Sequence, residues 1–404
     1  MKKIFILGGG YAGVSTALGL KGLNADVTLV NKHSYHYLTT LLHQPVAGRR
    51  SYQDLSVELK SILPSPVAFM RGTVDKIDPA SSTVSIKTRA GTVSQEYDIL
   101  VIALGWEPQF YNIPGLKEAS LTLHSLNTSR LAKDHIEEAL ILYDENPEES
   151  WRTTIVIGGG GLTGVELTGE LIDSRRKLAK SIETDPEQIR LILVEGAPTL
   201  LPGLDPWLAE KATSYLKNND VQCLTDTRIT AVGNQALELS NGKNLKAGTV
   251  IWTGGVRGNS LLEKNGFPVN RQGRTDVNSF MQAVNHPNIF VAGDCALVKD
   301  SQGNPLPPSA WLAVQQGKWV AQNIRMLLAG KGLLPYRPEV PGLIISLGRR
   351  NAAGVVAGRR LSGKTAAIIK DTLAFNHLRR IGGFRLVFKK LWEWAPYLIH
   401  LHRL

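Results

Sequence analysis

The chain has 404 residues, of which 43% are hydrophobic and 20% charged, values that fit a globular protein of two or three domains. Its two cysteines, Cys223 and Cys295, exclude a disulfide framework and suit a reducing compartment, and neither lies in a CxxC pair. The nine histidines show no spacing typical of a metal site, so no metal is expected.

The net charge of +11 is concentrated at one end of the chain. The segment from Arg359 to the end contains ten Lys and Arg residues but only two acidic residues, so it carries +8 of the total net charge. Such a concentration predicts an anionic surface as its partner. No stretch reaches the ~20 apolar residues that span a bilayer, and the apolar run after Met1 breaks at Gly8, too early for a signal peptide.

The first unit reads as alternating strands and helices. Its expected elements in chain order are a strand at 4–7, a helix at 12–23, a strand at 26–30, a small antiparallel sheet from 68–77 and 83–88, and a strand at 98–104 that ends at Gly105.

A second unit runs from about 112 to 253 and is expected to contain a strand at 153–157, a long helix after Gly161 and a strand at 190–194. After this unit we expect a further strand at 289–294 and, following a proline-rich stop, a helix at 310–328.

One glycine pattern occurs in both units. A GxGxxG turn follows the first strand of each, and a second glycine signature follows a later strand, 97 residues on in the first unit and 96 in the second. The glycines of the turns are Gly8, Gly10 and Gly13, then Gly159, Gly161 and Gly164. Such turns bring a pyrophosphate to a helix N-terminus. The pair therefore predicts two bound dinucleotides and hydride transfer between them.

The residues that end the second strand of each unit differ. Glu195 would accept the ribose hydroxyls and repel a 2′-phosphate, which favours NADH over NADPH. Its distance from Gly159 exceeds the usual ~20 residues, which predicts an extended helix between them. The first unit has Asn31-Lys32 at this position instead. The amide and the cation could hold the adenosine of a dinucleotide; alternatively, the pair is simply a solvated strand end.

Six segments resemble the type II NADH dehydrogenases, single-chain FAD enzymes that pass electrons to quinone. They are NKHSYHYLTTLLHQPVAG (31–48), GGGGLTGVELTGEL (158–171), VEGAPTLLPG (194–203), WTGGVRGNS (252–260), NIFVAGDCA (288–296) and RIGGFRLVFKK (380–390). The resemblance covers nearly the whole chain in matching order.

The resemblance implies an α/β fold with two nested Rossmann-type dinucleotide-binding domains and a C-terminal membrane-associating region. The implied boundaries are 1–111 with 256–330 for a discontinuous FAD-binding domain, 112–255 for an NADH-binding domain, and 331–404 for the C-terminal region. The residues implied for FAD are Gly8, Gly9, Gly10, Tyr11, Ala12, Gly13, Asn31, Lys32, Thr40, Val74, Gly105, Asp294, Ala310, Trp311 and Lys370. Those implied for NADH are Gly159, Gly161, Gly164, Glu195 and Gly255.

Glu166 is the acidic residue that the resemblance places between nicotinamide and flavin, where it would orient NADH or relay a proton to quinone. Alternatively, it complements the helix dipole near an N-terminus. Glu170, one turn later, is expected to be structural. Lys370 matches a family lysine near the flavin, although as a bare sequence feature it would be a surface lysine.

The expected quinone site departs from the family pattern. Gln315 is retained after the proline stop, but Trp311 occupies the position of the family's first glutamine. A large apolar ring with one N–H replaces an amide that would donate to a quinone carbonyl.

The segment from Phe384 to the end mixes basic residues with Trp, Phe, Tyr and Leu. This pattern predicts a segment at a membrane surface; alternatively, it packs on the protein or on a partner subunit, as in a possible homodimer. No nucleic-acid module is present.

The resulting expectation is a peripheral NADH:quinone oxidoreductase on the cytoplasmic side of the cell membrane, without proton pumping. The alternatives are a sulfide:quinone oxidoreductase, for which the two cysteines supply no plausible reactive pair, and a non-enzymatic flavoprotein that senses NADH.

Overall fold

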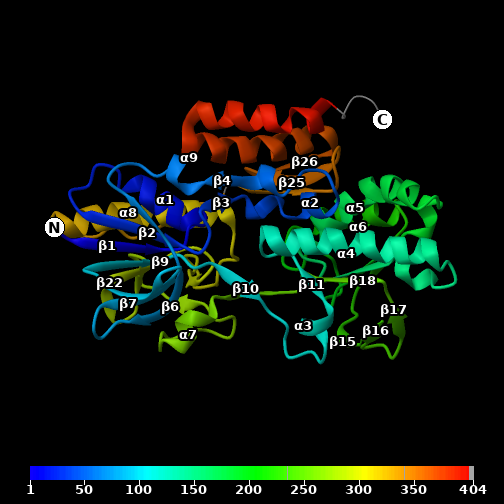
Figure 1. Cartoon of the computed structure of the whole chain (residues 1–404), viewed down its shortest axis with the longest axis horizontal. Helices are drawn as coiled ribbons and strands as arrows, with labels where there is room; N and C mark the ends of the chain where they lie inside the picture. The colour runs from blue at the N-terminus through cyan, green and yellow to red at the C-terminus, as the bar shows by residue number, and fades with distance from the viewer. Residues whose placement is uncertain (234, 341, 400–404) are drawn as a thin grey trace.

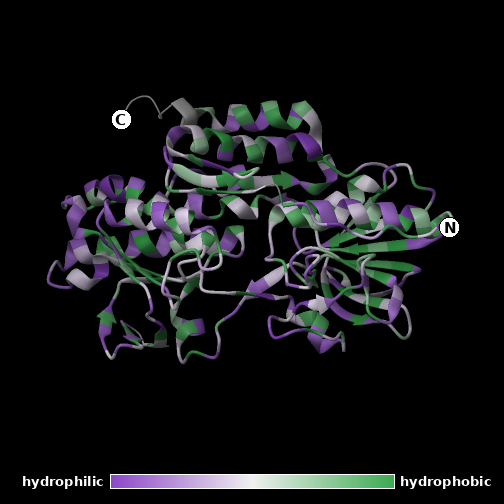
Figure 2. Ribbon diagram, turned by 180° about the vertical axis from the view of Figure 1, so that it is seen from behind, coloured by the Kyte–Doolittle hydropathy of each residue, from purple (hydrophilic) through white to green (hydrophobic). Residues whose placement is uncertain are grey.

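Two parallel β-sheets flanked by helices lie side by side along the long axis of the molecule, in a computed structural model that describes residues 1–233, 235–340 and 342–399 (Figure 1). The strands of both sheets are predominantly hydrophobic (Figure 2). Each sheet has its own buried hydrophobic cluster, as expected for strands covered on both faces.

The first sheet has six strands. Their order is β21 (Gln282–Ala283), β22 (His286–Val291), β9 (Ile99–Ile102), β1 (Lys3–Leu7), β2 (Asp26–Asn31) and β5 (Ala68–Arg71). All neighbours are parallel except β21 and β22. Leu7 pairs with Val30 on one side and with Ile102 on the other. The order of strands therefore reverses at β1, and Gly8 begins the turn at this switch point, where ligands of such sheets bind.

The expected elements of the first unit are found with two differences. Helix α1 (Tyr11–Gly19) ends four residues before the predicted end, because Gly19 and Gly22, the latter with φ of +71°, terminate it. The extended segment 68–77 belongs to two sheets. At Gly72 the chain leaves β5 of the parallel sheet and enters β6 (Thr73–Asp78), which pairs with the antiparallel strands β7 (Thr83–Thr88) and β8 (Gly91–Glu96).

The second sheet repeats the arrangement of the first. Its order is β11 (Leu121–Thr122), β18 (Thr249–Trp252), β12 (Thr154–Gly158), β13 (Arg190–Val194) and β14 (Val221–Leu224), all parallel. Helix α5 (Leu162–Ser181) connects β12 to β13 and has 20 residues against nine in α1. The extended helix that the position of Glu195 predicted is thus confirmed.

A short ribbon joins the two sheets. Strand β10 (Trp106–Pro108) pairs antiparallel with β19 (Val256–Gly258) and lies between the sheets (Figure 1). Helix α8 (Ala310–Leu328) starts and ends where predicted and packs on α1. The approach is close because Gly317 has no side chain: a Cβ there would lie 2.2 Å from the carbonyl oxygen of Ala12.

The C-terminal part consists of a small sheet and a long, broken helix. The antiparallel strands are β24 (Gly342–Ser346), β25 (Ala352–Val356) and β26 (Arg359–Ser362). Helix α9 (Gly363–Ile399) is interrupted at Gly383, whose φ of 67° and ψ of −170° are not helical. Its two halves lie side by side as a hairpin (Figure 1), and the rings of Phe375 and Trp394 meet across it at 4.9 Å.

The remaining elements support these three parts. The helices are α2 (His43–Val46), α3 (Leu116–Ala119), α4 (Leu126–Glu145), α6 (Pro206–Lys217) and α7 (Ser260–Lys264), and the strands are β3 (Tyr35–Tyr37), β4 (Ser56–Glu58), β15 (Ile229–Val232), β16 (Ala236–Leu239), β17 (Asn244–Lys246), β20 (Thr275–Asp276) and β23 (Ala296–Leu297).

Candidate active site

The first glycine turn leaves the N-terminus of α1 open to a ligand. Gly8 has φ of +109°, and a Cβ there would lie 2.2 Å from the carbonyl oxygen of Ala103; a Cβ on Gly13 would lie 1.9 Å from that of Gly8. These two glycines hold strand and helix together. Gly10 is the N-cap of α1, has no capping side chain, and has nothing within 4 Å of the position of a Cβ. The partial positive charge of the helix end therefore faces open space.

The second turn has the same construction. Gly159 has φ of +108°, and a Cβ on Gly164 would lie 1.9 Å from the carbonyl oxygen of Gly159. Gly161 is the N-cap of α5, again with no capping side chain and with open space around it. Two helix N-termini able to receive an anion thus occur at equivalent places in the two sheets.

The strand-end residues chosen from the sequence contact these turns. The side-chain oxygen of Asn31 accepts a hydrogen bond from the Gly9 amide at 3.0 Å. The carboxylate of Glu195 accepts from the amides of Gly160 at 2.6 Å and Ala197 at 2.8 Å. Lys32 is exposed beside Asn31.

The other predicted FAD residues lie in the first sheet and next to it. Val74 is half-buried on β6, and Gly105, with φ of +73°, follows β9. Gly255 lies at the corresponding place in the second unit, where a Cβ would meet the hydroxyl of Tyr111 at 2.5 Å.

Asp294 follows β22 at the same sheet edge. Burial raises the pKa of its carboxyl to about 6, although Arg274 acts in the opposite direction. The preceding Gly293 donates its amide hydrogen to the side chain of Gln316 at 2.6 Å. Gln316, which is 3% exposed on α8, was not singled out from the sequence because an isolated glutamine beside Gln315 gives no signal of its own.

The two residues expected at quinone bind another part of the chain. Trp311 Nε1 and Gln315 Nε2 donate to the carbonyl oxygen of Glu339 at 2.9 and 2.7 Å, and Gln315 Oε1 accepts from the Glu339 amide at 3.1 Å. Arg380 lies over the Trp311 ring at 5.5 Å. Helix α8 begins at Ala310, so Trp311 and Gln315 both lie in its first two turns. Through these bonds the two side chains fix the chain segment at Glu339 to the start of α8.

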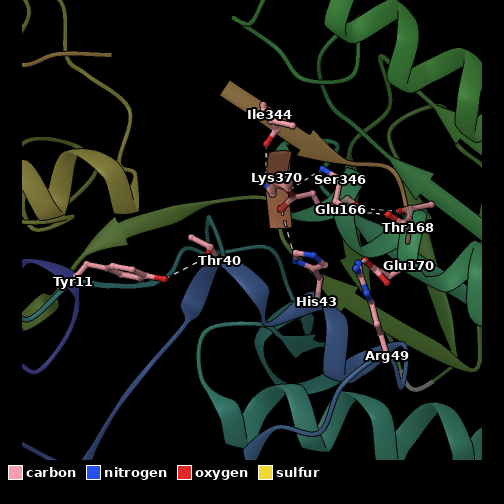
Figure 3. Close-up of polar contacts among 12 residues, drawn as sticks. Tyr11, Thr40, His43, Arg49, Glu166, Thr168, Glu170, Ile344, Ser346 and Lys370 are labelled. Atoms are coloured by element: carbon pink, nitrogen blue, oxygen red, sulfur yellow. Dashed lines mark hydrogen bonds and ion pairs between the residues drawn. The ribbon is translucent and has the colours of Figure 1, made fainter. Parts of the chain in front are cut away.

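Glu166 is buried where three parts of the chain meet (Figure 3). Its Oε1 accepts from Lys370 Nζ on α9 at 2.5 Å and from the Ser346 amide at the end of β24 at 3.0 Å. Lys370 also donates to the carbonyl oxygen of Ile344 at 2.8 Å. Burial acts to raise the pKa of Glu166, but Lys370, His43 and the Ser346 amide together hold it below its ordinary value. Glu166 is therefore an ionised carboxylate in an enclosed place.

Two residues of α2 and the loop after it complete this centre, and sequence reasoning did not identify them. His43 Nδ1 lies 3.7 Å from Glu166 Oε2. Arg49 pairs with Glu170 at 2.6 Å and with Asp371 at 3.3 Å, so Glu170 has the structural role expected of it. The histidine-rich run 33–43 was visible in the sequence, but no pattern within it distinguishes His43.

Tyr11 and Thr40 lie between the first turn and the Glu166 centre (Figure 3). Their hydroxyls are 3.3 Å apart, and burial raises the pKa of Tyr11 to about 12, so the phenol stays protonated. The Tyr11 ring also contacts His36 and His377. His36 joins the Gly9 carbonyl oxygen through Nδ1 and His377 of α9 through Nε2, both at 3.0 Å.

The second half of α9 has two different faces. Toward the protein, Trp394 is fully buried with the Arg50 guanidinium 3.9 Å from its ring centre, and Lys390 donates to the carbonyl oxygen of Asp54 at 2.8 Å. The outward face carries Phe384, Phe388 and Trp392, which are 64%, 68% and 84% exposed. The side chains of 396–404, which belong to the predicted membrane segment, lie outside the described residues.

Comparisons with known proteins agree with this architecture. The family described as pyridine nucleotide-disulphide oxidoreductase matches residues 2–317. The type II NADH:quinone oxidoreductase of Staphylococcus epidermidis is 36% identical over 399 residues, which cover 96% of this chain and 98% of that protein. The chain belongs to the type II NADH:quinone oxidoreductases. The Staphylococcus aureus member is 35% identical over the same length.

Two solved structures have the same fold as this type II oxidoreductase. NDH2 from Plasmodium falciparum, solved in complex with NADH, has a TM-score of 0.87 and 17% identity over 98% of each chain. The sulfide:quinone oxidoreductase of Aquifex aeolicus has a TM-score of 0.79 and 20% identity, covering 95% of this chain and 92% of that one.

The cysteines do not support the sulfide:quinone alternative. Cys295 is fully buried after Asp294 in the first sheet's domain, whereas Cys223 lies on β14 of the second sheet. Both are free thiols. Burial raises the pKa of Cys295 to about 11, which disfavours the reactive thiolate.

Proposed function

We propose that this protein is a peripheral-membrane NADH:quinone oxidoreductase that uses non-covalent FAD and does not pump protons. The observation that carries the proposal is the pair of open helix N-termini at α1 and α5, each of which follows the strand at the corresponding position in its sheet, β1 and β12. Two dinucleotide sites on one chain suit the transfer of a hydride from one cofactor to the other. The family relationship supports quinone as the acceptor.

The residues of the first unit fit FAD. A Cβ at Gly8 or Gly13 would collide with backbone, whereas the space before Gly10 is free for a pyrophosphate. Asn31 and Lys32 at the end of β2 suit the adenosine half of FAD, and Asp294 provides a half-buried carboxyl at the same sheet edge. Bound there, FAD supplies a carrier that accepts two electrons from NADH and delivers them to quinone.

The residues of the second unit fit NADH. Gly159 and Gly164 keep α5 against its strand, and Gly161 leaves its N-terminus accessible. Glu195 is fixed by two amides at the end of β13, with its carboxylate at the turn. A negative charge at this place repels a 2′-phosphate and so selects NADH.

Glu166 and Lys370 are the residues to which we assign the proton chemistry. NADH provides a hydride, and a quinone needs two electrons and two protons to become a quinol, so one proton per turnover comes from the protein. Glu166 is an ionised carboxylate beside Lys370 and closed off from solvent, so we assign it the role of a base that receives this proton and passes it on to quinone.

We also propose that the outward face of α9 docks on the cytoplasmic side of the membrane. Phe384, Phe388 and Trp392 recur every four residues and form one exposed aromatic stripe, with Arg385 and Lys389 beside it. Aromatic side chains insert at headgroup level while cations meet anionic lipid. None of the described helices is sufficiently long and apolar to cross a bilayer.

A specific observation favours a second candidate, a flavoprotein that senses NADH without passing electrons on. Trp311 and Gln315 are both engaged by Glu339, which closes the place where the family pattern predicts the quinone.

Steady-state NADH oxidation with a soluble quinone decides between these functions, together with the identity of the flavin released on denaturation. We expect turnover with quinone and release of FAD. Flavin bleaching by NADH without turnover would establish the sensor instead. The absence of a membrane potential in proteoliposomes during turnover tests the lack of pumping.

A further inference from the structure

The two oxygens of the Glu166 carboxylate have different surroundings. Oε1 accepts hydrogen bonds from Lys370 Nζ and from the Ser346 amide. Oε2 lies 3.7 Å from Nδ1 of His43. Because Oε1 is already held by two donors, Oε2 is the oxygen on which a proton is less disfavoured, and His43 is the imidazole that faces it (Figure 3).

His43 is buried, and one of its two ring nitrogens makes no hydrogen bond within the described residues. The side chain is 3% exposed, and its Nε2 is buried with no hydrogen-bond partner among the described residues. Burial lowers the pKa of the imidazole; Glu166 and Glu170 of α5 oppose this, whereas Lys370 of α9 and Arg49 reinforce it. A neutral imidazole donates from one nitrogen and accepts at the other, so it can pass a proton through the ring.

A small cavity lies among residues that neighbour His43 and Glu166, although these two residues do not themselves line it. Its volume is about 10 Å³, close to the space for a single water molecule. It is lined by Gln44, the chain neighbour of His43, and by Ser346 and Lys370, which both hold Glu166. The side-chain oxygen of Gln44 is buried without a partner within the described residues, which makes the surroundings of the cavity polar enough to hold water.

We propose that His43 is a proton-transfer residue that protonates Glu166 during quinone reduction, a role that rests on the function proposed above. In the resting protein Glu166 is a carboxylate. During quinone reduction the Nδ1–H bond of His43 breaks and an Oε2–H bond forms on Glu166, while Nε2 takes a proton from water and leaves hydroxide, which solvent neutralises. The Oε2–H bond then breaks and its proton goes to a quinone oxygen. The neutral imidazole now has its proton on Nε2, and exchange with water returns it to Nδ1 before the next turnover, so solvent supplies one proton per quinol formed.

The test uses the FAD-loaded protein and separates its two half-reactions by rapid mixing. In His43→Gln, we expect bleaching by NADH at the wild-type rate and a decrease of roughly 10²-fold in the quinone-driven step, the range of a lost general acid. His286→Gln is the matched control, since His286 lies at the start of β22 in another part of the first domain, and it should leave both steps unchanged.

A second readout needs no turnover. The infrared band of the protonated Glu166 carboxyl, assigned by its loss in Glu166→Gln, is titrated without NADH or quinone. Because His43 helps to hold the pKa of Glu166 down, the band in His43→Gln should appear at higher pH than in the wild type. If His43→Gln fails to bind FAD, His43→Ala with added imidazole replaces it, and recovery of the quinone step is expected.

Two results would overturn the role of His43: equal slowing of both half-reactions, which indicates a structural effect, or a quinone-driven step within twofold of the wild type. A wild-type quinone step in Glu166→Gln would instead refute the role proposed for Glu166. The two failures are therefore distinguishable.

Discussion

The amide of Gly160 donates to the carboxylate of Glu195 at 2.6 Å, and the amide of Gly9 donates in the same way to the side chain of Asn31 at 3.0 Å. The residue between the first two motif glycines of each turn, Gly9 or Gly160, thus binds the residue at the end of the neighbouring strand. The two sites share one backbone geometry but differ in charge at this position, which is neutral at Asn31 and negative at Glu195. We expect this difference to decide which dinucleotide each site binds.

Glu195→Gln should weaken the preference for NADH over NADPH. The amide retains an oxygen for the Gly160 hydrogen bond but removes the negative charge that repels a 2′-phosphate. We expect the ratio of kcat/KM values for the two nucleotides to fall by about tenfold, which corresponds to about 1.4 kcal/mol. Glu210→Gln, an exposed change on α6, is the control. An unchanged ratio would show that Glu195 does not meet the ribose.

Lys370→Met should destabilise the protein by about 3 kcal/mol, because it leaves Glu166 buried without its cation. The folded-state pKa of Glu166 is depressed, so the stabilisation from this pair is present above the ordinary carboxyl pKa and is lost as pH falls through the folded value.

Urea unfolding at neutral pH and at low pH measures both effects. The double variant Glu166→Gln/Lys370→Met should recover most of the loss, and Lys364→Met, exposed on the same helix, should cost little. A loss in Lys370→Met that is equally large at low pH would contradict the charge argument.

Trp311→Gln should improve quinone turnover, because it restores the amide of the family pattern and removes a ring that lies under Arg380. We expect kcat/KM for quinone to rise about tenfold, with no change in flavin bleaching by NADH. The matched control is Trp319→Gln, since Trp319 anchors the same segment through the Leu334 carbonyl oxygen two turns further along α8. An equal gain in both variants would mean that loosening the segment, rather than the amide at 311, is responsible.

The exposed stripe of α9 can be removed without disturbing the face that packs on the protein. Phe384→Ser/Phe388→Ser/Trp392→Ser should abolish co-sedimentation with anionic vesicles and leave activity with a soluble quinone intact. Leu131→Ser/Ile141→Ser, two exposed apolar positions on α4, controls for general loss of surface hydrophobicity. Undiminished vesicle binding by the triple variant would refute the docking face. Deleting 384–404 would be a poorer test, because it also removes Trp394 and Lys390 from the interior.

The sequence was most informative where backbone geometry demands one residue type. Gly8, Gly13, Gly159 and Gly164 were identifiable because a Cβ at each would collide with backbone, and the long interval before Glu195 correctly predicted a long α5. The resemblance pointed to Glu166 and Lys370, but the sequence gave no reason for their pairing at 2.5 Å, since they are 204 residues apart and meet only through tertiary packing.

The remaining features depend on contacts that leave no local pattern. His43 acquires significance from Glu166 on another domain, and Arg49 from Glu170 and Asp371. The division of 68–77 between two sheets follows from pairing partners, which single strands do not reveal. The tail was predicted as either membrane-facing or packed on the protein. The described inner face of its helix packs on residues 50–54, which a basic-aromatic composition alone does not distinguish.

The histidine pair that joins the first turn to α9 should make the fold sensitive to acid. Burial lowers the pKa of His36 to about 4 and that of His377 to about 2, below the ordinary value near 6.5 that both have when unfolded. The unfolded chain therefore binds more protons than the native protein below about pH 6.5, and stability is lost as pH falls from there toward the folded values. Each histidine contributes up to about 1.4 kcal/mol per pH unit to this slope. His377→Gln should accordingly reduce the loss of unfolding free energy between pH 6 and pH 4.5 by about that amount per unit, measured by urea titration. The control is His135→Gln, an exposed position on α4, which should keep the wild-type slope. A slope in His377→Gln as steep as in the wild type would show that the pair does not carry the acid sensitivity.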